Sequence, residues 1–204
     1  YKDTHIKQTV SIYQKHLKQI IKNYHPKNGI CFVFEKEFPR LDEKKRICHG
    51  FHLEFVHTIL HKAEQDVHLI PRIKTEVEEK NLFGDICGNS EEVIDKSCTS
   101  KFWLLYGSRK KENLDFYKLT KIYNDSGQEI TLDEALKDFV LLDIHEDKIE
   151  LNESNYTYYL PRILSINPLN KTPCEIKKDL NIIIKKKLKK AKDSKKVYDE
   201  LPVP

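Results

Sequence analysis

The regular spacing of apolar residues near the start of the chain constrains its fold most strongly. Between residues 4 and 24 these residues recur at steps of three and four, at Ile6, Val10, Tyr13, Leu17, Ile20, Ile21 and Tyr24. The spacing predicts an α-helix with one apolar side. Asp3 or Thr4 can cap its start, and His25-Pro26 ends it, because the residue before a proline disfavours helical backbone.

Two strands are predicted directly after this helix. The run Ile30–Phe34 is short, continuous and rich in aromatic residues, as is typical of a buried strand. Asn28-Gly29 before it is a turn signal. The polar stretch 35–46, which contains a proline, separates this run from a second strand at about Ile47–Val56. We therefore predict a β-hairpin with a long tip.

Further helices and strands alternate along the rest of the chain. We predict a helix over about Lys62–Lys80 that is kinked near Pro71, strands at Val93–Asp95, Phe102–Tyr106 and Phe116–Tyr123, and helices opened by capping boxes at Thr131–Glu134 and Thr172–Glu175. The first capping box is expected to open a helix that runs through Leu141. This order of elements predicts an α+β fold, with an antiparallel or mixed sheet covered by helices.

The composition excludes several classes of protein. The 204 residues include 36 basic and 32 acidic side chains, and 39% of the chain is hydrophobic, which fits one globular domain with or without an appended segment. No stretch approaches the roughly 20 consecutive apolar residues of a membrane span, and no signal peptide opens the chain. The sequence contains no Met, so we expect it to be a piece of a longer protein.

The cysteines and histidines give a weak metal-binding pattern. The five cysteines are odd in number and irregularly spaced, which indicates reduced thiols in an intracellular compartment. The nearest approach to a zinc ligand set is Cys48, His49 and His52, followed by His57, His61 and His68. Zinc needs three or four converging ligands. We therefore favour histidines scattered over a polar face, and a zinc-supported structural domain stays the alternative.

His52 is the first candidate for chemistry. Strand alternation puts Phe51 and Leu53 on one face and His52 and Glu54 on the other. The small Gly50 beside it lets backbone approach closely, so the imidazole of His52 can point at an anionic ligand. An ordinary surface histidine on a half-exposed sheet is the competing interpretation.

Two further candidates lie downstream. Asp95 ends a short apolar strand, a position typical of a Mg²⁺ ligand, although it can also simply cap the following turn. The stretch Tyr106–Lys111 follows an aromatic strand and offers a glycine turn, the hydroxyl of Ser108 and the charges of Arg109 and Lys110 for phosphates. It lacks the spacing of an ordinary P-loop. A solvated basic hairpin end is its competing interpretation.

Two charged segments are assigned simpler roles. The lysine-rich helix predicted over 174–192 can attract phosphates or an acidic partner, and it has no Trp or Phe to anchor it on a membrane. We interpret it as a charged linker helix to a following domain. The stretch Leu142–Asp147 resembles a metal-binding acidic cluster, but it lies at the end of a predicted helix and is not interpreted as a catalytic site.

Four short motifs in order carry a family resemblance: Cys31–Glu35, Gly50–Phe55, Val93–Lys96 and Trp103–Lys110. Their succession resembles the primase domain of the primase-helicases of large cytoplasmic DNA viruses, of the poxvirus and African swine fever virus type. These domains belong to the archaeo-eukaryotic primase superfamily. The segment Tyr158–Ile166 resembles the stretch that follows the domain.

The resemblance implies an architecture and an activity. It implies a primase core with an RRM-like sheet over residues 1–170, and a basic helical linker over 171–204 that leads to a ring-forming helicase domain of the same polypeptide. The implied reaction is template-directed nucleotidyl transfer for primer synthesis in DNA replication, with Mg²⁺ or Mn²⁺ as cofactor. The implied partners are template DNA, nucleoside triphosphates and further copies in a helicase hexamer, without a membrane, in the host cytoplasm.

The resemblance also implies roles for individual residues. His52 falls on the family's second motif and is expected at the phosphates of an incoming nucleotide, with Gly50 where many relatives have serine. Asp95 falls on the third motif and is expected to bind the catalytic metal. Ser108 and Lys110, with Arg109 between them, are expected to hold the triphosphate.

One departure from the family pattern limits this expectation. The first motif, an Asp-any-Asp pair, is expected before the first helix, and we expect it to have been cut off ahead of Tyr1. Without those carboxylates two metal ions cannot be clamped, so this part of the protein is expected to be inactive or nearly so. The alternative function is a non-catalytic nucleic-acid-binding or protein-docking module, in which His52, Asp95 and Ser108 do not converge.

Overall fold

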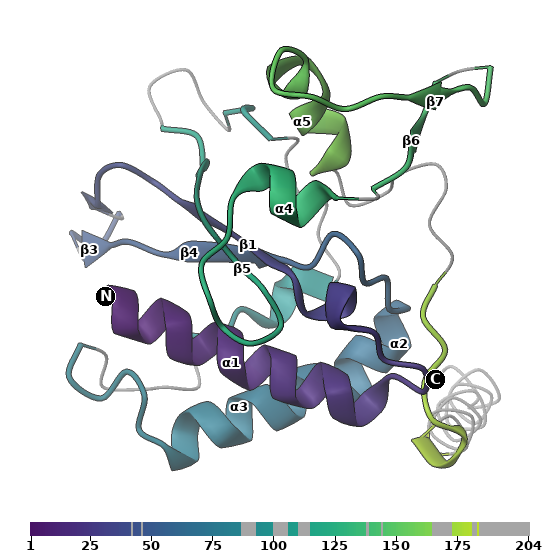
Figure 1. Ribbon diagram of the computed structural model, residues 1–204. Helices are drawn as coiled ribbons and strands as arrows, with labels where there is room; N and C mark the ends of the chain where they lie inside the picture. The colour runs from purple at the N-terminus through teal and green to yellow at the C-terminus, as the bar shows by residue number, and fades with distance from the viewer. Residues whose placement is uncertain are drawn as a thin grey trace, which may run out of the picture.

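The fold is that of a computed structural model, which describes residues 1–41, 43–45, 47–86, 93–99, 106–109, 115–137, 139–143, 145–164, 173–180 and 183. Its centre is an antiparallel sheet in the order β4-β1-β5, formed by Phe51–Glu54, Cys31–Glu35 and Lys118–Tyr123. Helices lie on both sides of this sheet, with α1 and α3 below it and α4 and α5 above it in the view of Figure 1. The predicted α+β class is confirmed.

The first helix, α1 (Asp3–Ile20), has the predicted apolar side. Ile6 and Val10 are fully buried against Cys31 and Val33 of β1, so half of the stripe covers the sheet. Each buried side chain of this size contributes roughly 1.5–3 kcal/mol relative to an exposed one. The other half, which includes Leu17, packs into the cluster that α1 shares with α3.

The helix ends earlier than predicted, at Ile20 instead of Tyr24. Ile21 is extended and forms an isolated antiparallel bridge with Ile176. The backbone of Lys177 donates a hydrogen bond to the carbonyl of Ile20. The pairing with a segment far along the chain therefore takes over the hydrogen bonds that a longer helix would have made.

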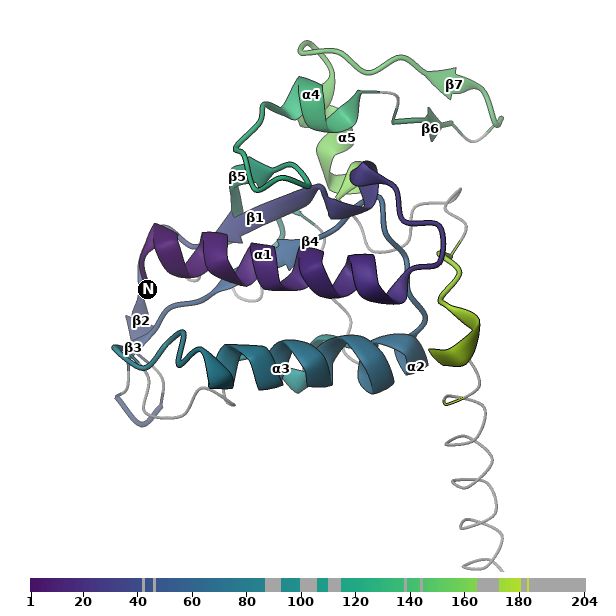
Figure 2. The same ribbon diagram turned by 60° about the horizontal axis from the view of Figure 1, so that its bottom comes forward.

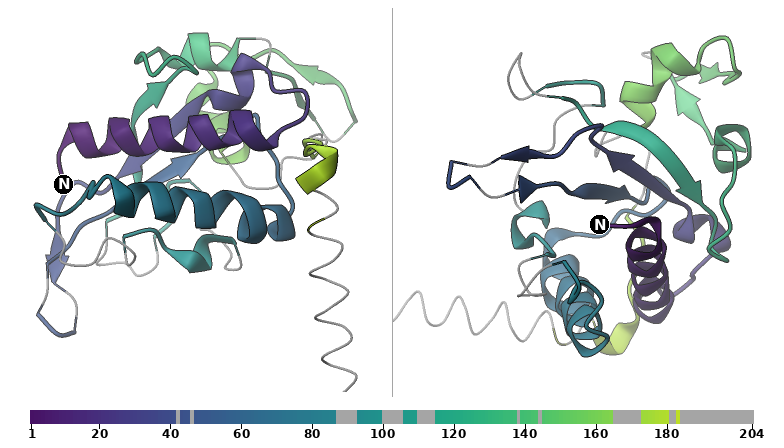
Figure 3. Two further views of the ribbon diagram at one scale, coloured as in Figure 1. Left: turned by 90° about the horizontal axis from the view of Figure 1, so that it is seen from below. Right: turned by 90° about the vertical axis from the view of Figure 1, so that its left-hand side faces the viewer.

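The predicted hairpin is confirmed. β1 pairs with β4, and beyond this pair the two chains continue as the short pair β2 (Arg40–Leu41) and β3 (Ile47–Cys48). Figure 3 shows this extension projecting beyond the sheet. Because side chains alternate across a strand, Phe32 and Phe34 face the apolar cluster that β1 shares with the elements above the sheet, while Cys31 and Val33 face α1.

The helix predicted over 62–80 consists of three parts in succession: α2 (Lys62–Glu64), the π-helical turn η2 (Gln65–Leu69) and α3 (Ile70–Glu79). The irregularity lies directly before Pro71, as predicted. Pro71 has no N–H to donate to the carbonyl four residues earlier. The backbone N–H of Ile70 donates to the carbonyl of Gln65, five residues earlier, which is the hydrogen bond of a π-helix. Figure 2 shows α3 running alongside α1.

A buried ionic cluster joins α1 to α3. The Glu76 side chain is 8% exposed, and its carboxylate lies 2.8 Å from the ammonium groups of Lys15 and Lys80 and 2.9 Å from Nε2 of His16. Burial alone would raise the pKa of Glu76, but the hydrogen bonds from the two lysines lower it to about 2. The carboxylate is therefore ionised at neutral pH.

The layer above the sheet is built from short elements: α4 (Leu132–Leu136), β6 (Leu141–Leu142), β7 (Lys148–Ile149) and α5 (Tyr156–Ile163). The capping box of Thr131 and Glu134 forms as predicted. The helix does not reach Leu141, however, because Lys137 leaves helical backbone and Leu141 pairs with Ile149 as a buried strand residue.

Two other sequence predictions are corrected. Residues 93–95 form a turn and a bend before the 3-10 helix η4 (Lys96–Thr99), not a strand. Residues 173–177 are not helical and helical backbone first appears at 178, because Ile176 is held in its bridge to Ile21. The strand predicted at 102–106 and the cap at Thr172 lie outside the described residues, apart from Tyr106. Among the helices described, none is long and apolar enough to cross a membrane.

Candidate functional site

His52 lies in β4, directly opposite Phe34 of β1. The predicted alternation holds, since Phe51 and Leu53 pack with the α1 side of the sheet and His52 is on the other side. Its imidazole is stacked on the ring of Tyr117, with centroids 3.8 Å apart and planes at 21°. A Cβ atom at Gly50 would meet nothing within 4 Å, so the described structure does not require glycine there.

Two cations act on the Tyr117 ring of the stacked pair. The ammonium group of Lys36 lies 5.1 Å from the centroid of the Tyr117 ring, within the range of a cation–π contact. Burial raises the pKa of the Tyr117 phenol, and the charge of Arg40 opposes that rise, which places Arg40 within electrostatic range of the ring. Lys36 and Arg40 both belong to the chain that runs out from β1 into the hairpin.

The imidazole of His52 is neutral at pH 7. Burial and, to a smaller extent, the charge of Lys36 lower its pKa to about 4, while the charge of Asp95 acts in the opposite direction. A neutral imidazole carries one N–H donor and one acceptor nitrogen. His52 can therefore donate a hydrogen bond to an anion but does not attract it as a cation.

Asp95 is exposed and follows Ile94, which is buried in the cluster between α1 and α3. Its backbone carbonyl accepts a hydrogen bond from the N–H of Cys98 at 3.4 Å, at the start of η4. Burial raises the pKa of the Cys98 thiol, and Asp95 adds to that rise. Since its charge also acts on His52, Asp95 lies within electrostatic range of both side chains.

Ser108 and Arg109 are exposed, and the chain that leads into them lies on the side of the sheet that carries His52. The preceding Tyr106 packs its ring on Phe34, with centroids 5.8 Å apart, and its hydroxyl accepts a hydrogen bond from the backbone of Leu119. Gly107 has φ +81°, a left-handed backbone that glycine adopts without strain. Lys110 lies outside the described residues.

The guanidinium of Arg109 lies over the ring of Phe116, 5.6 Å from its centroid. Lys118 lies 5.9 Å from the same ring and also forms an ion pair with Glu37. Phe116 immediately precedes Tyr117. Arg109 and His52 therefore contact two consecutive residues of the chain. This arrangement can bind a polyanion along an aromatic surface.

The described residues do not complete a metal site. They contain no group of three or more His, Cys, Asp or Glu side chains placed to hold a metal ion. Asp95 is the one predicted metal ligand, and a single carboxylate does not supply the six or so oxygen ligands of a hard divalent cation. Any further ligands for such an ion have to come from outside the described residues.

The histidines considered for zinc have separate roles. Nε2 of His57 lies 3.1 Å from the carbonyl of Ala135, while His61 caps α2, and its backbone N–H donates to the side chain of Glu64. His68 contacts the carbonyl of Leu180. The acidic cluster is a turn between β6 and β7, in which a carboxylate oxygen of Asp143 accepts backbone hydrogen bonds.

Tyr117, Lys36 and Arg40 were not predicted from the sequence. The alternation of the strand at 116–123 carried a usable signal, because it placed an aromatic residue next to the sheet face of His52. Lys36 and Arg40 fell in a stretch interpreted only as a polar loop. Their role follows from the pairing of β1 with β4 and β5, which local patterns do not reveal.

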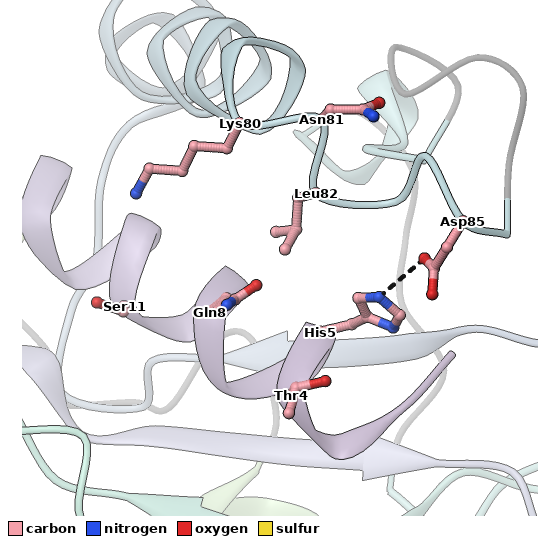
Figure 4. Close-up of a pocket in the computed structure, with 8 residues that line it drawn as sticks. All are labelled: Thr4, His5, Gln8, Ser11, Lys80, Asn81, Leu82 and Asp85. Carbon is pink, nitrogen blue, oxygen red and sulfur yellow. Dashed lines mark ion pairs between the residues drawn. The ribbon is translucent and has the colours of Figure 1, made fainter.

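A separate pocket of about 650 Å³ lies on the α1 side of the sheet, between the start of α1 and the end of α3. Figure 4 shows His5 and Asp85 at one end of it, with Nε2 of His5 3.1 Å from a carboxylate oxygen of Asp85. Neither His52, Asp95, Ser108 nor Arg109 lines this pocket. It is therefore distinct from the face that carries the predicted site residues.

Comparisons with known proteins bear on the resemblance. Residues 1–123 match the family described as the N-terminal AEP domain of the C962R protein, where AEP denotes archaeo-eukaryotic primase. The chain is 31% identical over 182 residues to the 184R protein of Invertebrate iridescent virus 6, which is named as a helicase; the match covers 82% of this chain and 18% of that protein.

A second curated relative is similar. The chain is 29% identical over 201 residues to the 121R protein of Invertebrate iridescent virus 3, also named as a helicase, and the match covers 93% of this chain and 21% of that protein. The chain thus spans about a fifth of the length of the curated relatives it matches. No solved structure matches it significantly.

Proposed function

Because the chain belongs to the family of the N-terminal AEP domain of the C962R protein, we propose that it is the primase part of a longer protein that carries out primer synthesis in viral DNA replication. The reaction is template-directed, metal-dependent nucleotidyl transfer from nucleoside triphosphates. The observation that supports this most directly is the face of the sheet on which His52 stacks on Tyr117, with Lys36 beside the Tyr117 ring and with Arg40 and Asp95 in electrostatic range.

His52 contacts the phosphates of the incoming nucleotide in this proposal. Its low pKa keeps the ring neutral at pH 7, so it contributes a directed N–H hydrogen bond and the neighbouring cations contribute the charge. The stack on Tyr117 fixes the plane of the ring and hence the direction of that N–H. Phosphoryl chemistry depends mainly on such positioning and charge neutralisation.

Ser108, Arg109 and Lys110 hold the triphosphate. Arg109 presents a planar guanidinium that can bind phosphate oxygens in pairs, and the Phe116 ring beneath it limits its motion. Asp95 is one ligand of the catalytic Mg²⁺ or Mn²⁺. Because one carboxylate does not hold such an ion, we assign the remaining ligands to residues outside the described set.

The wider architecture follows the family. In this proposal the core of residues 1–170 has an RRM-like sheet, and 171–204 form a basic linker to a helicase domain of the same polypeptide. That helicase forms hexamers, and template DNA and nucleoside triphosphates are the partners. The site of action is the host cytoplasm. The helicase names of the two iridescent virus relatives support a linked helicase.

A primer-synthesis assay on the longer natural protein tests this function. We expect Asp95→Asn and His52→Ala each to reduce primer synthesis by at least about 100-fold, because each removes a group that acts on the reacting phosphates. Glu153→Gln, an equally small change at an exposed carboxylate beyond β7, is the matched control and should retain full synthesis. Equal activity of Asp95→Asn and the control would overturn the proposal.

One observation favours the second candidate, a nucleic-acid-binding module without catalysis. The described residues supply a cationic aromatic face but only a single predicted metal ligand. The same assay separates the two functions. A natural protein that binds template and triphosphate but forms no primer with either Mg²⁺ or Mn²⁺ would support the module.

A further inference from the structure

The hairpin formed by β2 and β3 carries an unusual concentration of exposed apolar side chains. Phe38 is 62% exposed, Leu41 64% and Ile47 78%. Leu41 and Ile47 are directly paired across the two strands, so they form one apolar surface at the projecting end. Exposing apolar side chains side by side costs solvation free energy, and such a patch commonly marks a binding surface.

Basic side chains lie in the same hairpin as this apolar pair. Arg40, Lys44 and Lys45 are all exposed there and outnumber the exposed acidic Glu43 of the tip. Lys45 has φ +59°, a left-handed conformation that turns the chain at the tip. Apolar side chains that contact bases, with cations beside them for phosphates, are the combination that nucleic-acid surfaces use.

The base of the hairpin is firmly held. The Tyr1 ring stacks on His49 with centroids 4.8 Å apart and meets the edge of Phe51 at 5.0 Å. Nε2 of His49 lies 3.0 Å from the carbonyl of Lys36, which ties the two sides of the hairpin together. The exposed end is therefore presented by a braced support.

The hairpin is also continuous with the candidate site. It extends β1 and β4, the strands that carry Phe34 and His52, and Arg40 at its base lies within electrostatic range of Tyr117. The hairpin and the His52–Tyr117 face are therefore connected through the same two strands.

We propose that the β2–β3 hairpin binds single-stranded DNA, with its bases against Leu41 and Ile47 and its phosphates at Arg40, Lys44 and Lys45. This inference rests on the proposed function for the direction of the strand, which runs from the hairpin to His52. The charge complementarity of the hairpin favours a polyanion as the occupant over a second copy of the chain.

Binding of fluorescein-labelled oligo-dT to the 204-residue chain, followed by anisotropy between 50 and 200 mM salt, tests the proposal. We expect Leu41→Ser/Ile47→Ser to weaken binding about tenfold with an unchanged salt slope, because it removes base contacts and no charge. Lys44→Gln/Lys45→Gln should reduce the slope of log affinity against log salt by about 1.4, from two phosphate contacts.

Two matched controls accompany these variants. Ile86→Ser/Val140→Ser changes two side chains that are 49% and 52% exposed elsewhere, and Lys7→Gln/Lys148→Gln removes two exposed lysines. Both should bind like the unchanged chain. Equal DNA affinities of the hairpin variants and their controls would overturn the proposal. It would also be overturned if Leu41→Ser/Ile47→Ser changed the sedimentation of the protein and left its DNA affinity unchanged.

A crosslinking measurement detects the contact directly, so it separates a lost DNA contact from misfolding of a variant. The photoreactive residue p-benzoylphenylalanine in place of Ile47 should crosslink to oligo-dT, and in place of Val140 it should not. Failure to crosslink from position 47 while the protein still binds DNA overturns the hairpin site and leaves primer synthesis untouched. If the natural protein crosslinks to DNA through position 47 but makes no primers, the proposed enzymatic function is wrong and the hairpin still stands as a DNA contact.

Discussion

The imidazole of His52 and the phenol of Tyr117 are stacked with their centroids 3.8 Å apart, although 65 positions separate them in the sequence. Antiparallel pairing of β1 with both β4 and β5 brings them together, because Phe34 lies opposite His52 on one side and Leu119 on the other. The stack helps to keep the imidazole half-buried, and burial is the main reason that its pKa is low.

Tyr117→Ala should raise the pKa of His52 from about 4 towards its ordinary value of 6.5, because the imidazole loses the ring that shields it from water. Tyr117→Phe keeps the ring and should leave that pKa low. NMR titration of the His52 ring protons measures both. In the primer assay, Tyr117→Ala should lower synthesis and Tyr117→Phe should retain it; identical titrations of the two variants would show that Tyr117 does not position His52.

Asp95→Asn should move the pKa of His52 in the opposite direction. The carboxylate of Asp95 raises that pKa, so its neutral replacement should lower it further below 4. The same NMR titration measures the shift, and Glu153→Gln serves as the control. An unchanged His52 titration in Asp95→Asn would mean that the two side chains are too far apart to share a site.

His52 should make the folded state less stable in mild acid. The unfolded chain binds a proton at His52 near pH 6.5, whereas the folded chain binds it only near pH 4. As the pH falls between these values, folding must release that proton, and the free energy of unfolding falls by up to roughly 1 kcal/mol per pH unit. His52→Gln should flatten this part of the profile in urea unfolding at pH 7, 6, 5 and 4.5. A variant profile parallel to that of the unchanged chain would contradict the low pKa.

The elements with strong local signals were predicted well. The apolar stripe of α1, the aromatic run of β1 and the capping box at Thr131 each depend on residues within a few positions of one another. The predicted irregularity before Pro71 likewise follows from a single missing N–H. Each of these features can therefore be predicted from a short stretch of neighbouring residues.

The errors have tertiary causes. The helix ending at Ile20 and the extended backbone at Ile176 are explained only by their mutual bridge, which joins residues more than 150 positions apart. The roles of Lys36 and Arg40 depend on the pairing of β1 with β4 and β5. The predicted roles of His52, Asp95, Ser108, Arg109 and Lys110 came from local patterns together with the family resemblance and remain predictions, with Lys110 outside the described residues.

The ionic cluster of α1 and α3 gives the last prediction. Glu76→Gln removes the carboxylate that Lys15 and Lys80 both contact, which should lower the free energy of unfolding at pH 7 by about 1–3 kcal/mol. Because the folded pKa of Glu76 is about 2, its stabilisation is present above pH 4.5 and is lost as the pH falls towards 2. The destabilisation by Glu76→Gln should therefore shrink in acid.

Glu78→Gln, an exposed position in the same helix, is the control and should change the free energy of unfolding by less than about 0.5 kcal/mol. Urea unfolding of both variants at pH 7 and pH 3 measures this difference, and equal effects of the two substitutions would show that the buried carboxylate does not join the helices.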